Sequence, residues 1–428
     1  MDVEVVPGGV AGRARPPPSK SATHRALVLA AVGGGGRVHR PLRSADTRAT
    51  ATLLEAMGAS VSLDAEPAVV DAPPAGRLRP PTEVVDCANS GTTLRLGAGL
   101  AATVDGRTVL TGDASLRRRP NAPLLGALER LGATAEGSGA MGEAPVTVAG
   151  PIEGGPTTLE ASTSSQFLSS LLLAGSLVHR ELAVEVVDGV ASRPYVTLTR
   201  EALALAGVEV TDGDGRYVVP AGATPRTPPA GFTVGVDPTS ASYLLAAGAL
   251  AGRPDVGVTG LDGGLRRPLP VRDHLAAMDL PLEADGDALV VGQGRPAPAT
   301  VDLGACPDLL PTVGVLAGVA DGTSRLVNCP QARHKESDRI AATADLLRCL
   351  GVEVRELADG LVVEGRPAGF EGGVVESGGD HRLAMAGAVA GLAASRPVRV
   401  RDGDAVAVSY PDFFEALADL GADVRPVR

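Results

Sequence analysis

A single unit is repeated six times along the 428 residues of this chain. In each copy a helix-like stretch ends in an apolar residue and a Gly, or in one copy an Asp, and a short strand-like segment follows. The copies recur roughly every 70 to 75 residues, a spacing typical of a duplicated supersecondary unit. The residue after each helix is expected to take the left-handed conformation that ends many helices. These positions are Gly58, Gly132, Gly207, Asp279, Gly351 and Gly421.

Two of the copies indicate what the unit contains. Leu124, Leu125, Leu128 and Leu131 form one apolar stripe at helical spacing. In the next copy, valines on either side of two glycines predict a hairpin over 208–219. Each unit is therefore expected to be a helix packed on strands, and the fold class to be α/β.

Two proline-rich stretches, residues 15–18 and 220–230, divide the chain into halves of three repeats each. Such stretches are stiff, extended linkers. We therefore expect two similar α/β domains, the first over 19–230 and the second over 231–428 together with 1–18, joined by two crossings. Binding sites are common at domain interfaces, so the active site is expected in a cleft between them. One continuous solenoid of six units is the alternative.

Composition limits the classes of partner. Hydrophobic residues make up 44% of the chain, as in globular proteins, and no apolar run is long enough to span a bilayer. The start of the chain has no cationic segment, so no signal peptide is expected and the protein should be soluble and cytoplasmic. The net charge of -11 argues against nucleic-acid binding but permits a basic pocket for a small anion. The four cysteines lack metal-ligand spacing, so reduced thiols and no metal site are expected.

Lysine is almost absent from the chain. Of the 39 basic residues, only Lys20 and Lys335 are lysine, and the rest are arginine. A lysine ammonium is a compact charge whose pKa can shift, whereas a guanidinium stays protonated. Chance survival of two surface lysines is the alternative. Both lie in dense clusters of polar residues, however, which favours a functional role.

In the first half, polar clusters stand where apolar helices are expected to begin. Residues 18–25 place hydroxyls and two cations at a helix start, with Ser19 or Ser21 as the cap, and this combination suits an anion. Residues 86–96 repeat the pattern, and Gly91 there allows the backbone to approach a ligand closely. A surface cap or a plain turn would look similar in each case.

Two further segments follow in the same half. Residues 111–120 hold three consecutive arginines, which form either a solvated surface run or a loop that closes on a doubly anionic substrate. Residues 162–168 open an apolar helix with Ser and Gln, which can hold hydroxyls and phosphate without adding charge.

The densest cluster, residues 333–339, precedes the helix of the fifth repeat. On a helix, Lys335 and Arg339 would share a face, although structural ion pairs are the alternative. Asp308 precedes another apolar helix, as a candidate acid or as a helix cap. Residues 380–385 begin an Ala-rich helix with a cation, which the helix dipole disfavours, and this conflict suggests function.

The clusters of both halves together supply enough cations to hold two phosphates and a carboxylate. Closing a cleft lined in this way would expel water and strengthen each contact. The cations are Lys20, Arg25, Arg119, Lys335, Arg339 and Arg382.

Ten segments of the chain resemble, in order, those of EPSP synthases, from about residue 18 to the end. The resemblance implies the enolpyruvyl transferase fold, a two-domain inside-out α/β barrel built from six βαββαβ repeats, three per domain. Segments such as CANSGTT and VSYPDFF resemble the archaeal members most. The ten segments read PSKSATHRALVLA, CANSGTTLRL, LTGDASLRRRP, STSSQFLSSLLLAG, SRPYVTLT, DPTSASYLLAAGAL, PDLLPT, RHKESDR, DHRLAMAGAV and SYPDFFEAL.

The resemblance implies transfer of the enolpyruvyl group of phosphoenolpyruvate to the 5-hydroxyl of shikimate-3-phosphate, in the shikimate pathway to chorismate and aromatic amino acids. The hydroxyl adds to C2 while C3 is protonated, and phosphate then leaves a tetrahedral intermediate. Asp308 resembles the proton acceptor for the hydroxyl. Glu336 resembles the group that protonates the methylene, with Lys20 a competing candidate. No metal or organic cofactor is implied, and a monomer is expected.

The resemblance also implies which residues bind the two substrates. Those for shikimate-3-phosphate are Lys20, Ser21, Arg25, Ser164, Ser165, Gln166, Ser192, Asp308, Gln331 and Lys335. Those for phosphoenolpyruvate are Lys20, Asn89, Gly91, Thr92, Arg119, Gln166, Arg339, His381 and Arg382.

Three positions depart from the family pattern. Many members have a phosphoenolpyruvate-binding lysine where this chain has Val408. Bacterial members often have Asn at the position of Gln331, and many members have Pro at the position of Leu96. The last difference lies beside the expected phosphoenolpyruvate contacts, so inhibitor sensitivity does not follow from the sequence.

Two other functions compete with this interpretation. The related enolpyruvyl transferases that act on UDP-N-acetylglucosamine have Asn after the first lysine and a reactive Cys in the arginine loop. Here Ser21 follows Lys20, and the loop over 112–120 has no Cys. A non-catalytic repeat scaffold is the second alternative, and it predicts no need for Asp308 or Glu336.

Overall fold

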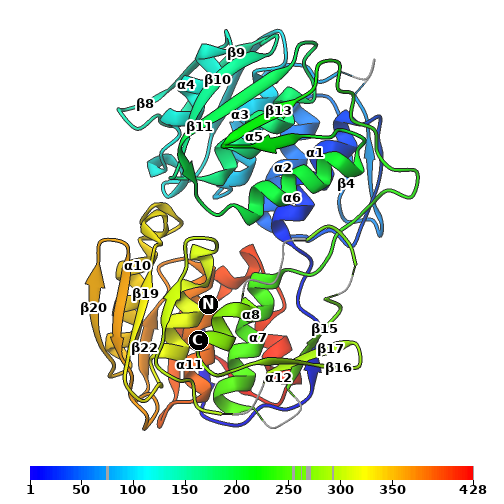
Figure 1. Ribbon diagram of the computed structural model, residues 1–428. Helices are drawn as coiled ribbons and strands as arrows, with labels where there is room; N and C mark the ends of the chain where they lie inside the picture. The colour runs from blue at the N-terminus through cyan, green and yellow to red at the C-terminus, as the bar shows by residue number, and fades with distance from the viewer. Residues whose placement is uncertain (74–76, 253–255, 262, 267–270, 292–293, 428) are drawn as a thin grey trace. The chain divides into compact units, whose positions relative to one another are not determined.

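The computed structural model describes residues 1–73, 77–252, 256–261, 263–266, 271–291 and 294–427. The chain forms two compact units, drawn in Figure 1. The amino-terminal unit consists of Pro18–Gly235 and Gly264–Arg267. The carboxy-terminal unit consists of Met1–Pro17, Val236–Gly263 and Pro268–Arg428, so it takes both ends of the chain.

The amino-terminal unit combines α-helices with short strands. Its described helices are α1 (Lys20–Val32), α2 (Ala45–Ala56), α3 (Gly91–Ala101), α4 (Ala122–Arg130), α5 (Ser165–Gly175) and α6 (Pro194–Leu205), with a 3-10 helix η2 (Leu116–Arg118). Its strands are β3 (Gly36–His39), β4 (Ser60–Ser62), β5 (Ala68–Asp71), β6 (Val85–Asp86), β7 (Gly106–Thr111), β8 (Thr134–Ser138), β9 (Glu143–Gly150), β10 (Gly155–Ala161), β11 (Leu182–Val190), β12 (Thr211–Gly213), β13 (Arg216–Val219) and β14 (Phe232–Thr233).

The carboxy-terminal unit is built in the same way. Its helices are α7 (Pro238–Ala251), α8 (Val271–Ala277), α9 (Leu310–Ala317), α10 (Arg339–Cys349), α11 (His381–Leu392) and α12 (Phe413–Asp419), with 3-10 helices η3 (Pro307–Leu309), η4 (Pro330–His334) and η5 (Gly403–Val408). Its strands are β1 (Asp2–Val6), β2 (Arg13–Ala14), β15 (Gly257–Thr259), β16 (Leu282–Asp285), β17 (Ala288–Val291), β18 (Thr300–Asp302), β19 (Thr323–Val327), β20 (Glu353–Leu357), β21 (Gly360–Glu364), β22 (Gly373–Glu376), β23 (Val398–Arg401) and β24 (Asp423–Val427). In the part of the chain that the structure describes, no helix is long and apolar enough to cross a membrane.

The six four-stranded sheets found among the described residues share one arrangement. A parallel pair at one edge is followed by two antiparallel strands, as in the order β6-β7-β9-β8. Parallel neighbours need a long crossover between them, and α3 provides it for β6 and β7. The repeat of helix and strands predicted from the sequence is therefore confirmed as the building block of the fold.

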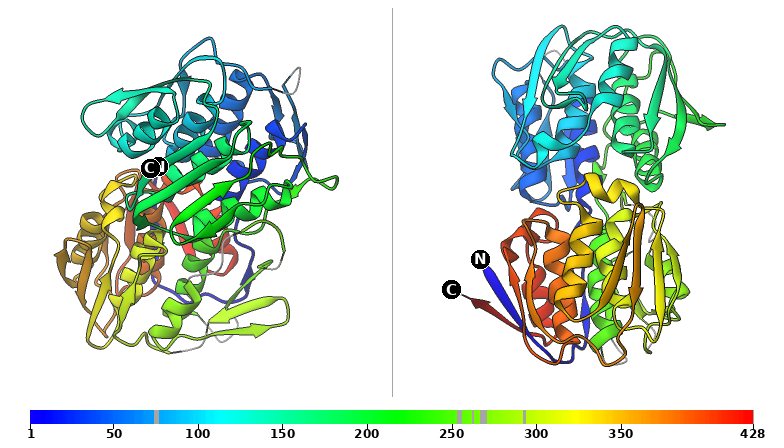
Figure 2. Two further views of the ribbon diagram at one scale, coloured as in Figure 1. Left: turned by 45° about the horizontal axis from the view of Figure 1, so that its top comes forward. Right: turned by 90° about the vertical axis from the view of Figure 1, so that its left-hand side faces the viewer.

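Three strands reach their sheets from distant parts of the chain. β14 pairs in parallel with β3, and β2 pairs in parallel with β15. β1 lies between β23 and β24 and is antiparallel to both. The two ends of the chain therefore lie side by side in one sheet of the carboxy-terminal unit, as the right-hand view of Figure 2 shows.

Helices occupy the centre of each unit and sheets lie outside them (Figures 1 and 2). All 12 residues of α11 are buried, and this helix packs against α7 and α9. In the amino-terminal unit α3 packs against α5, and most residues of both are buried. A helix that is apolar on all sides belongs in a core. Helices such as α4 bury only one face, which contains Leu124, Leu125 and Leu128 of the predicted stripe.

All six predicted helix ends are confirmed. The backbone φ angles are 101° at Gly58, 102° at Gly132, 81° at Gly207, 56° at Asp279, 86° at Gly351 and 97° at Gly421. The bonds follow the Schellman pattern, as where the Gly58 N–H donates to Glu55 O and the Ala59 N–H donates to Leu54 O. Even Asp279 takes the left-handed conformation, which costs a residue with a side chain more than it costs Gly.

Candidate active site

The helix starts of the two units carry different caps. Serine side chains cap the three inner helices of the amino-terminal unit, at Ser19, Ser90 and Ser164. Aspartate side chains cap three helices of the carboxy-terminal unit, at Asp237, Asp338 and Asp380. A neutral hydroxyl leaves the positive end of the helix dipole uncompensated, whereas a carboxylate already supplies an anion. The amino-terminal unit is therefore the better place for an incoming anion at a helix start.

Lys20 is the first residue of α1 and has a defined partner. Its Nζ lies 2.7 Å from Asp46 Oδ2, on α2, and the two side chains are 14% and 7% exposed. Asp46 Oδ1 is buried without a hydrogen-bond partner among the described residues. A lysine held by a single carboxylate oxygen keeps further N–H donors available, and Ser21 follows it at the same helix start.

Arg25 is buried, with 1% of its surface exposed. Its Nε donates to Thr199 Oγ1 at 2.7 Å, Nη2 donates to Ser169 Oγ at 3.1 Å, and Nη1 donates to Ser21 O at 2.8 Å. The structure therefore shows Arg25 joining α1 to α5 and α6. Its role in substrate binding stays a prediction.

Arg119 is the inward-facing member of the predicted arginine loop. It is 7% exposed, while Arg117 and Arg118 are exposed. Arg119 Nη2 donates to Asn89 Oδ1 at 2.6 Å, and Asn89 Nδ2 donates to Asp113 Oδ2 at 2.6 Å. The loop is thus bonded to the segment that precedes α3.

Gly91 lies close to two of the predicted polar side chains, while its approach to a ligand stays a prediction. A Cβ placed there would lie 3.2 Å from Arg119 Nη1 and 3.7 Å from Gln166 Oε1. Gln166 Nε2 donates to Thr92 Oγ1 at 2.9 Å, so the starts of α3 and α5 are bonded directly. Asn89, Gly91, Thr92, Arg119 and Gln166 therefore form one group in the structure.

Arg95 on α3, which the sequence analysis did not single out, forms hydrogen bonds to this group. Its Nη1 donates to Gln166 Oε1 at 2.8 Å and to Ser164 Oγ at 3.3 Å. The guanidinium also lies 5.0 Å from the centroid of the Phe167 ring. The sequence signal that could have identified this residue is a single arginine within a helix of mostly apolar and small residues. Arg95 is one of the buried residues of α3.

Two further serines of the prediction lie at or near helix starts. Ser165 is the first residue of α5 and is buried. Ser192 is also buried, and its φ of 52° places it in the left-handed region two residues before α6. Such a conformation costs on the order of 1–3 kcal/mol and is common at functional sites. Among the described residues, Ser192 forms no hydrogen bond with the group around Gln166.

In the carboxy-terminal unit, Arg339 is enclosed by carboxylates. Its Nη1 lies 2.6 Å from Asp308 Oδ1, its Nε lies 2.8 Å from Asp380 Oδ2, and its Nη2 bonds to the Glu336 carboxylate. The side chain is 1% exposed. Burial lowers the pKa of Arg339, but Asp380, Glu336 and Asp308 raise it to a net value above the ordinary one. The guanidinium therefore stays charged.

Asp308 is in turn surrounded by cations. Lys335 Nζ lies 3.8 Å and Arg382 Nε lies 3.6 Å from the same Oδ1 that Arg339 contacts. The alternative role as a helix cap is wrong, because Leu309 is the cap of α9. Three cations (Lys335, Arg339, Arg382) and three carboxylates (Asp308, Glu336, Asp380) give this cluster a formal charge of zero.

The expectation that Lys335 and Arg339 share a helix face is wrong. Lys335 follows η4 in an extended conformation, and α10 begins only at Arg339. Asp338 caps α10 by accepting from the Ile340 N–H and the Ala341 N–H. The helix begins at Arg339, the last residue of the cluster, and Lys335 reaches Asp308 from the preceding loop.

The start of α11 resolves the apparent conflict of a cation at a helix N-terminus. Asp380 caps the helix, accepts from the Arg382 N–H at 3.0 Å and bonds Arg339, so a carboxylate faces the dipole. His381 is 1% exposed, with Nδ1 3.8 Å from Asp380 Oδ1. Arg382 is 7% exposed and points toward Asp308.

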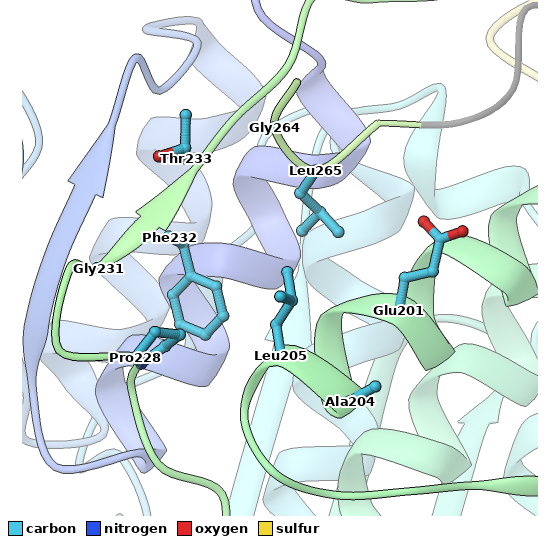
Figure 3. Close-up of a pocket in the computed structure, with 9 residues that line it drawn as sticks. All are labelled: Glu201, Ala204, Leu205, Pro228, Gly231, Phe232, Thr233, Gly264 and Leu265. Atoms are coloured by element: carbon cyan, nitrogen blue, oxygen red, sulfur yellow. The ribbon is translucent and has the colours of Figure 1, made fainter. Parts of the chain in front are cut away.

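A pocket of about 650 Å³ lies elsewhere in the amino-terminal unit. In Figure 3, Leu205, Phe232 and Leu265 face one another across it. Of the described residues that line it, Glu201 alone is ionisable, and burial raises the pKa of this carboxyl. An apolar lining with one carboxyl does not suit an anion, and none of the predicted site residues lines this pocket.

Known proteins resemble this chain over its whole length. Residues 6–417 match the family described as EPSP synthase (3-phosphoshikimate 1-carboxyvinyltransferase). The chain belongs to the EPSP synthase family. A 3-phosphoshikimate 1-carboxyvinyltransferase of Natronomonas pharaonis is 43% identical and one of Halobacterium salinarum is 44% identical, each with 99% of both chains covered.

Solved structures with the fold of this EPSP synthase family member include two enolpyruvyl transferases. An EPSP synthase from Acinetobacter baumannii has a TM-score of 0.80 at 26% identity, covering 99% of this chain and 100% of that one. The enolpyruvyl transferase NikO from Streptomyces tendae has a TM-score of 0.76 at 19% identity, covering 99% and 98%. The second likeness concerns the fold alone.

Three positions where this chain departs from the family pattern lie within or beside the helices of the two units. Gln331 is buried in η4, and its Nε2 donates to Gly304 O at 3.3 Å. Val408 is the half-buried last residue of η5. Leu96 is buried within α3. Among the described residues, no group of acidic, His and Cys side chains is arranged to hold a metal ion.

Two acids that sequence reasoning missed complete the two clusters. Asp46 pairs with Lys20, and Asp380 pairs with Arg339. In the sequence Asp46 has only the signature of an acid in the first turn of a helix, which has an ordinary structural explanation. Asp380 lies in the segment 380–385 that the sequence analysis selected. That interpretation relied on the cation Arg382 and gave Asp380 no role.

Proposed function

We propose that this chain transfers the enolpyruvyl group of phosphoenolpyruvate to the 5-hydroxyl of shikimate-3-phosphate and releases phosphate, as a step toward chorismate and aromatic amino acids. The similarity to curated 3-phosphoshikimate 1-carboxyvinyltransferases over 99% of the chain carries the proposal. The polar groups described above support it, since both substrates are polyanions and the predicted residues gather where cations and helix starts meet. We further propose that the groups of both units act on the same pair of substrates.

Asp308 is proposed to accept the proton of the 5-hydroxyl. The hydroxyl oxygen then bonds to C2 of phosphoenolpyruvate while a proton is added to C3, and this gives a tetrahedral intermediate. The three cations within 4 Å of Asp308 fix its orientation. A carboxylate held in one place is suited to general base catalysis, because proton transfer depends first on geometry.

The proton for C3 has two candidate donors. Glu336 is bonded to Arg339, and Lys20 is paired with Asp46. Whichever group donates takes the proton back when C3 is deprotonated, the bond from C2 to the phosphate oxygen breaks and the enol ether is restored. Lys20 is a candidate because its ammonium keeps N–H donors beyond the one that Asp46 accepts. After donation the Lys20–Asp46 pair carries a net charge of -1 until the proton returns.

Arg119, Arg339, Arg382 and Lys335 are proposed to hold the phosphate and carboxylate groups and to stabilise the phosphate that leaves. The cluster around Asp308 is neutral without substrate. An incoming anion would therefore compete with Asp308 and Glu336 for the same guanidinium groups. We expect the bound anion to replace Asp308 and Glu336 as ion-pair partners of the guanidinium groups, instead of entering an empty basic pocket. The buried charges then stay compensated both with and without substrate.

The remaining parts of the proposal concern organisation. Domains over 19–230 and over 231–428 with 1–18, a site between them, a monomeric state and a cytoplasmic location are proposed with the function. The residues Ser21, Arg25, Ser164, Ser165, Ser192 and Gln331 are proposed to bind shikimate-3-phosphate, and His381 to contact phosphoenolpyruvate. The chemistry consists of proton transfers and electrostatic stabilisation, for which the proposal invokes no cofactor.

The test is phosphate release from phosphoenolpyruvate with either shikimate-3-phosphate or UDP-N-acetylglucosamine as acceptor. Release with shikimate-3-phosphate alone, lost in Lys20→Ala and Asp308→Ala, is the expected result. Release with UDP-N-acetylglucosamine alone would mean that the chain has the activity of the related transferases instead. A folded protein that is inactive with both acceptors would support a non-catalytic scaffold.

A further inference from the structure

His24 is a fully buried titratable residue that the mechanism does not use. It lies one helical turn after Lys20 on α1, and its exposed fraction is 0%. Its Nδ1 lies 2.7 Å from Thr50 Oγ1, on α2. Its Nε2 has no hydrogen-bond partner among the residues that the structure describes. One ring nitrogen is thus engaged and the other is not.

The contact of His24 with Thr50 is the first link of a buried chain of hydroxyl groups. Thr50 Oγ1 lies 2.7 Å from Thr93 Oγ1, on α3. Thr93 Oγ1 lies 2.7 Å from Ser90 Oγ and 3.2 Å from Asp46 O. This relay, defined as His24, Thr50, Thr93 and Ser90, therefore connects α1 and α2 to the start of α3 through the core.

The direction of the hydrogen bonds follows from counting protons. Thr93 has a single hydroxyl proton, which it donates to Ser90 Oγ at 2.7 Å or to the Asp46 carbonyl at 3.2 Å. Thr50 must then donate to Thr93 and accept from His24, which requires a proton on Nδ1. In the opposite direction His24 would carry its proton on Nε2, and a buried N–H would lack an acceptor among the described residues. The relay thus favours the neutral Nδ1–H tautomer.

The relay touches groups that the proposed function uses through Ser90 and through Thr93, which bonds to Asp46 O. Ser90 is the cap of α3, whose first residues are Gly91 and Thr92, and its Oγ also accepts from the Thr93 N–H at 3.1 Å. Asp46 carries the carboxylate that holds Lys20. A shift of the relay would therefore move the start of α3 relative to Lys20.

We propose that His24, as the Nδ1–H tautomer, is a positioning residue that sets the start of α3 against the Lys20–Asp46 pair. This inference rests on the proposed function. Burial and the nearby charges of Lys20 and Arg25 lower the pKa of His24 well below its ordinary value, which agrees with a neutral ring. Because Gly91 and Thr92 are proposed contacts of phosphoenolpyruvate, loss of the relay should affect that substrate first.

Thr50→Val interrupts the relay and keeps the branched shape of the side chain. Thr108→Val is the matched control, because Thr108 is a buried threonine on β7 whose hydroxyl has no partner among the described residues. We expect Thr50→Val to raise the KM for phosphoenolpyruvate about tenfold, since a buried hydroxyl partner is lost. The KM for shikimate-3-phosphate should stay within about twofold in both variants. Equal KM values for phosphoenolpyruvate in Thr50→Val and Thr108→Val would overturn the proposal.

His24→Leu should reproduce the effect of Thr50→Val, and His24→Asn should largely restore the KM, because its amide places an N–H donor near the position of Nδ1. The protonated nitrogen of the wild-type ring can be read directly by 15N NMR of labelled histidine, with His24→Asn to assign the signal. A proton on Nε2 would overturn the proposal. This measurement needs no substrate. A wild-type protein with the Nδ1–H tautomer but no phosphate release would therefore refute the proposed function and the positioning role of His24, while the hydrogen-bonded relay itself would stand.

Discussion

Arg95 Nη1 lies 2.8 Å from Gln166 Oε1, and this bond orients the Gln166 amide so that its nitrogen donates to Thr92 Oγ1 at 2.9 Å. An amide has two similar ends, and only its partners decide which end is oxygen. A guanidinium can only donate, so it selects the oxygen. Arg95 thereby aligns the starts of α3 and α5, where an anion is proposed to bind.

The first prediction concerns Arg95. Arg95→Met keeps the apolar stem and removes the donors, so the Gln166 amide loses its orientation. Because hydrogen bonds from charged donors are worth roughly 1.5–3 kcal/mol, kcat/KM for phosphoenolpyruvate should fall by about 10- to 100-fold. Arg107→Met, at an exposed arginine of β7, is the control and should leave the kinetics unchanged. Wild-type kinetics in a folded Arg95→Met variant would show that Gln166 needs no such support.

The second prediction concerns the ion pair between Asp380 and Arg339. Both side chains are buried, and Asp380 also caps α11. Asp380→Ala should lower the free energy of unfolding by about 3–5 kcal/mol, because it leaves a buried guanidinium short of a partner. Urea denaturation measures this change.

A surface pair is the matched control for Asp380. Arg48 Nη2 lies 2.6 Å from Asp64 Oδ1, but these side chains are 52% and 70% exposed. Asp64→Ala should change the free energy of unfolding by less than about 1 kcal/mol. Similar losses in the two variants would mean that burial does not decide the strength of these pairs.

The third prediction is a pH dependence of stability caused by His24. Its pKa in the folded protein lies well below the ordinary value of 6.5 because of burial, Lys20 and Arg25. Near that value the unfolded chain binds a proton and the folded chain does not, so stability decreases as pH falls. Between about pH 7 and pH 5, His24 should reduce the free energy of unfolding by up to about 1.4 kcal/mol per pH unit.

Urea denaturation at several pH values tests this dependence, with His24→Gln as the comparison. The variant should show a shallower slope over the same range and no difference in slope above about pH 7.5, where histidine is neutral in both states. Carboxyls with a lowered pKa, such as Asp64 beside Arg48, act only at lower pH, where they begin to bind protons. Equal slopes for both proteins would contradict the assignment to His24.

The fourth prediction compares two helical glycines. A Cβ on Gly99 of α3 would lie 2.3 Å from Ser170 Oγ and 2.7 Å from Ser170 O on α5, whereas a Cβ on Gly126 of α4 would meet only the end of Arg130, at 3.4 Å. Gly99→Ala should therefore destabilise the protein by about 1–3 kcal/mol through overpacking. Gly126→Ala should stabilise it by up to about 1 kcal/mol, because Ala is the better helix former. Thermal denaturation of both variants measures whether their changes in stability have opposite signs.

Several features of the fold could be predicted because they depend on neighbours in the sequence. The helix ends at Gly58 and Gly132 follow from an apolar stripe and a residue that tolerates positive φ. The prediction of a shared helix face for Lys335 and Arg339 was wrong because two short-range signals compete there. The charges of Lys335 and Arg339 fit a helix face, but the Asp338 side chain caps the backbone N–H groups and sets the boundary.

The sequence by itself determined the six repeats, the helix starts that carry polar residues and the resemblance to a family, since each depends on spacing along the chain. Only the tertiary structure decided which charges pair. Lys20 and Asp46 are 26 residues apart, Arg95 and Gln166 are 71 apart, and Arg339 and Asp380 are 41 apart. Their contacts exist because the inner helices of each unit pack together and bring their starts side by side. Arg119 was recognisable as one of three arginines, but only the fold turns it inward while its neighbours stay in solvent.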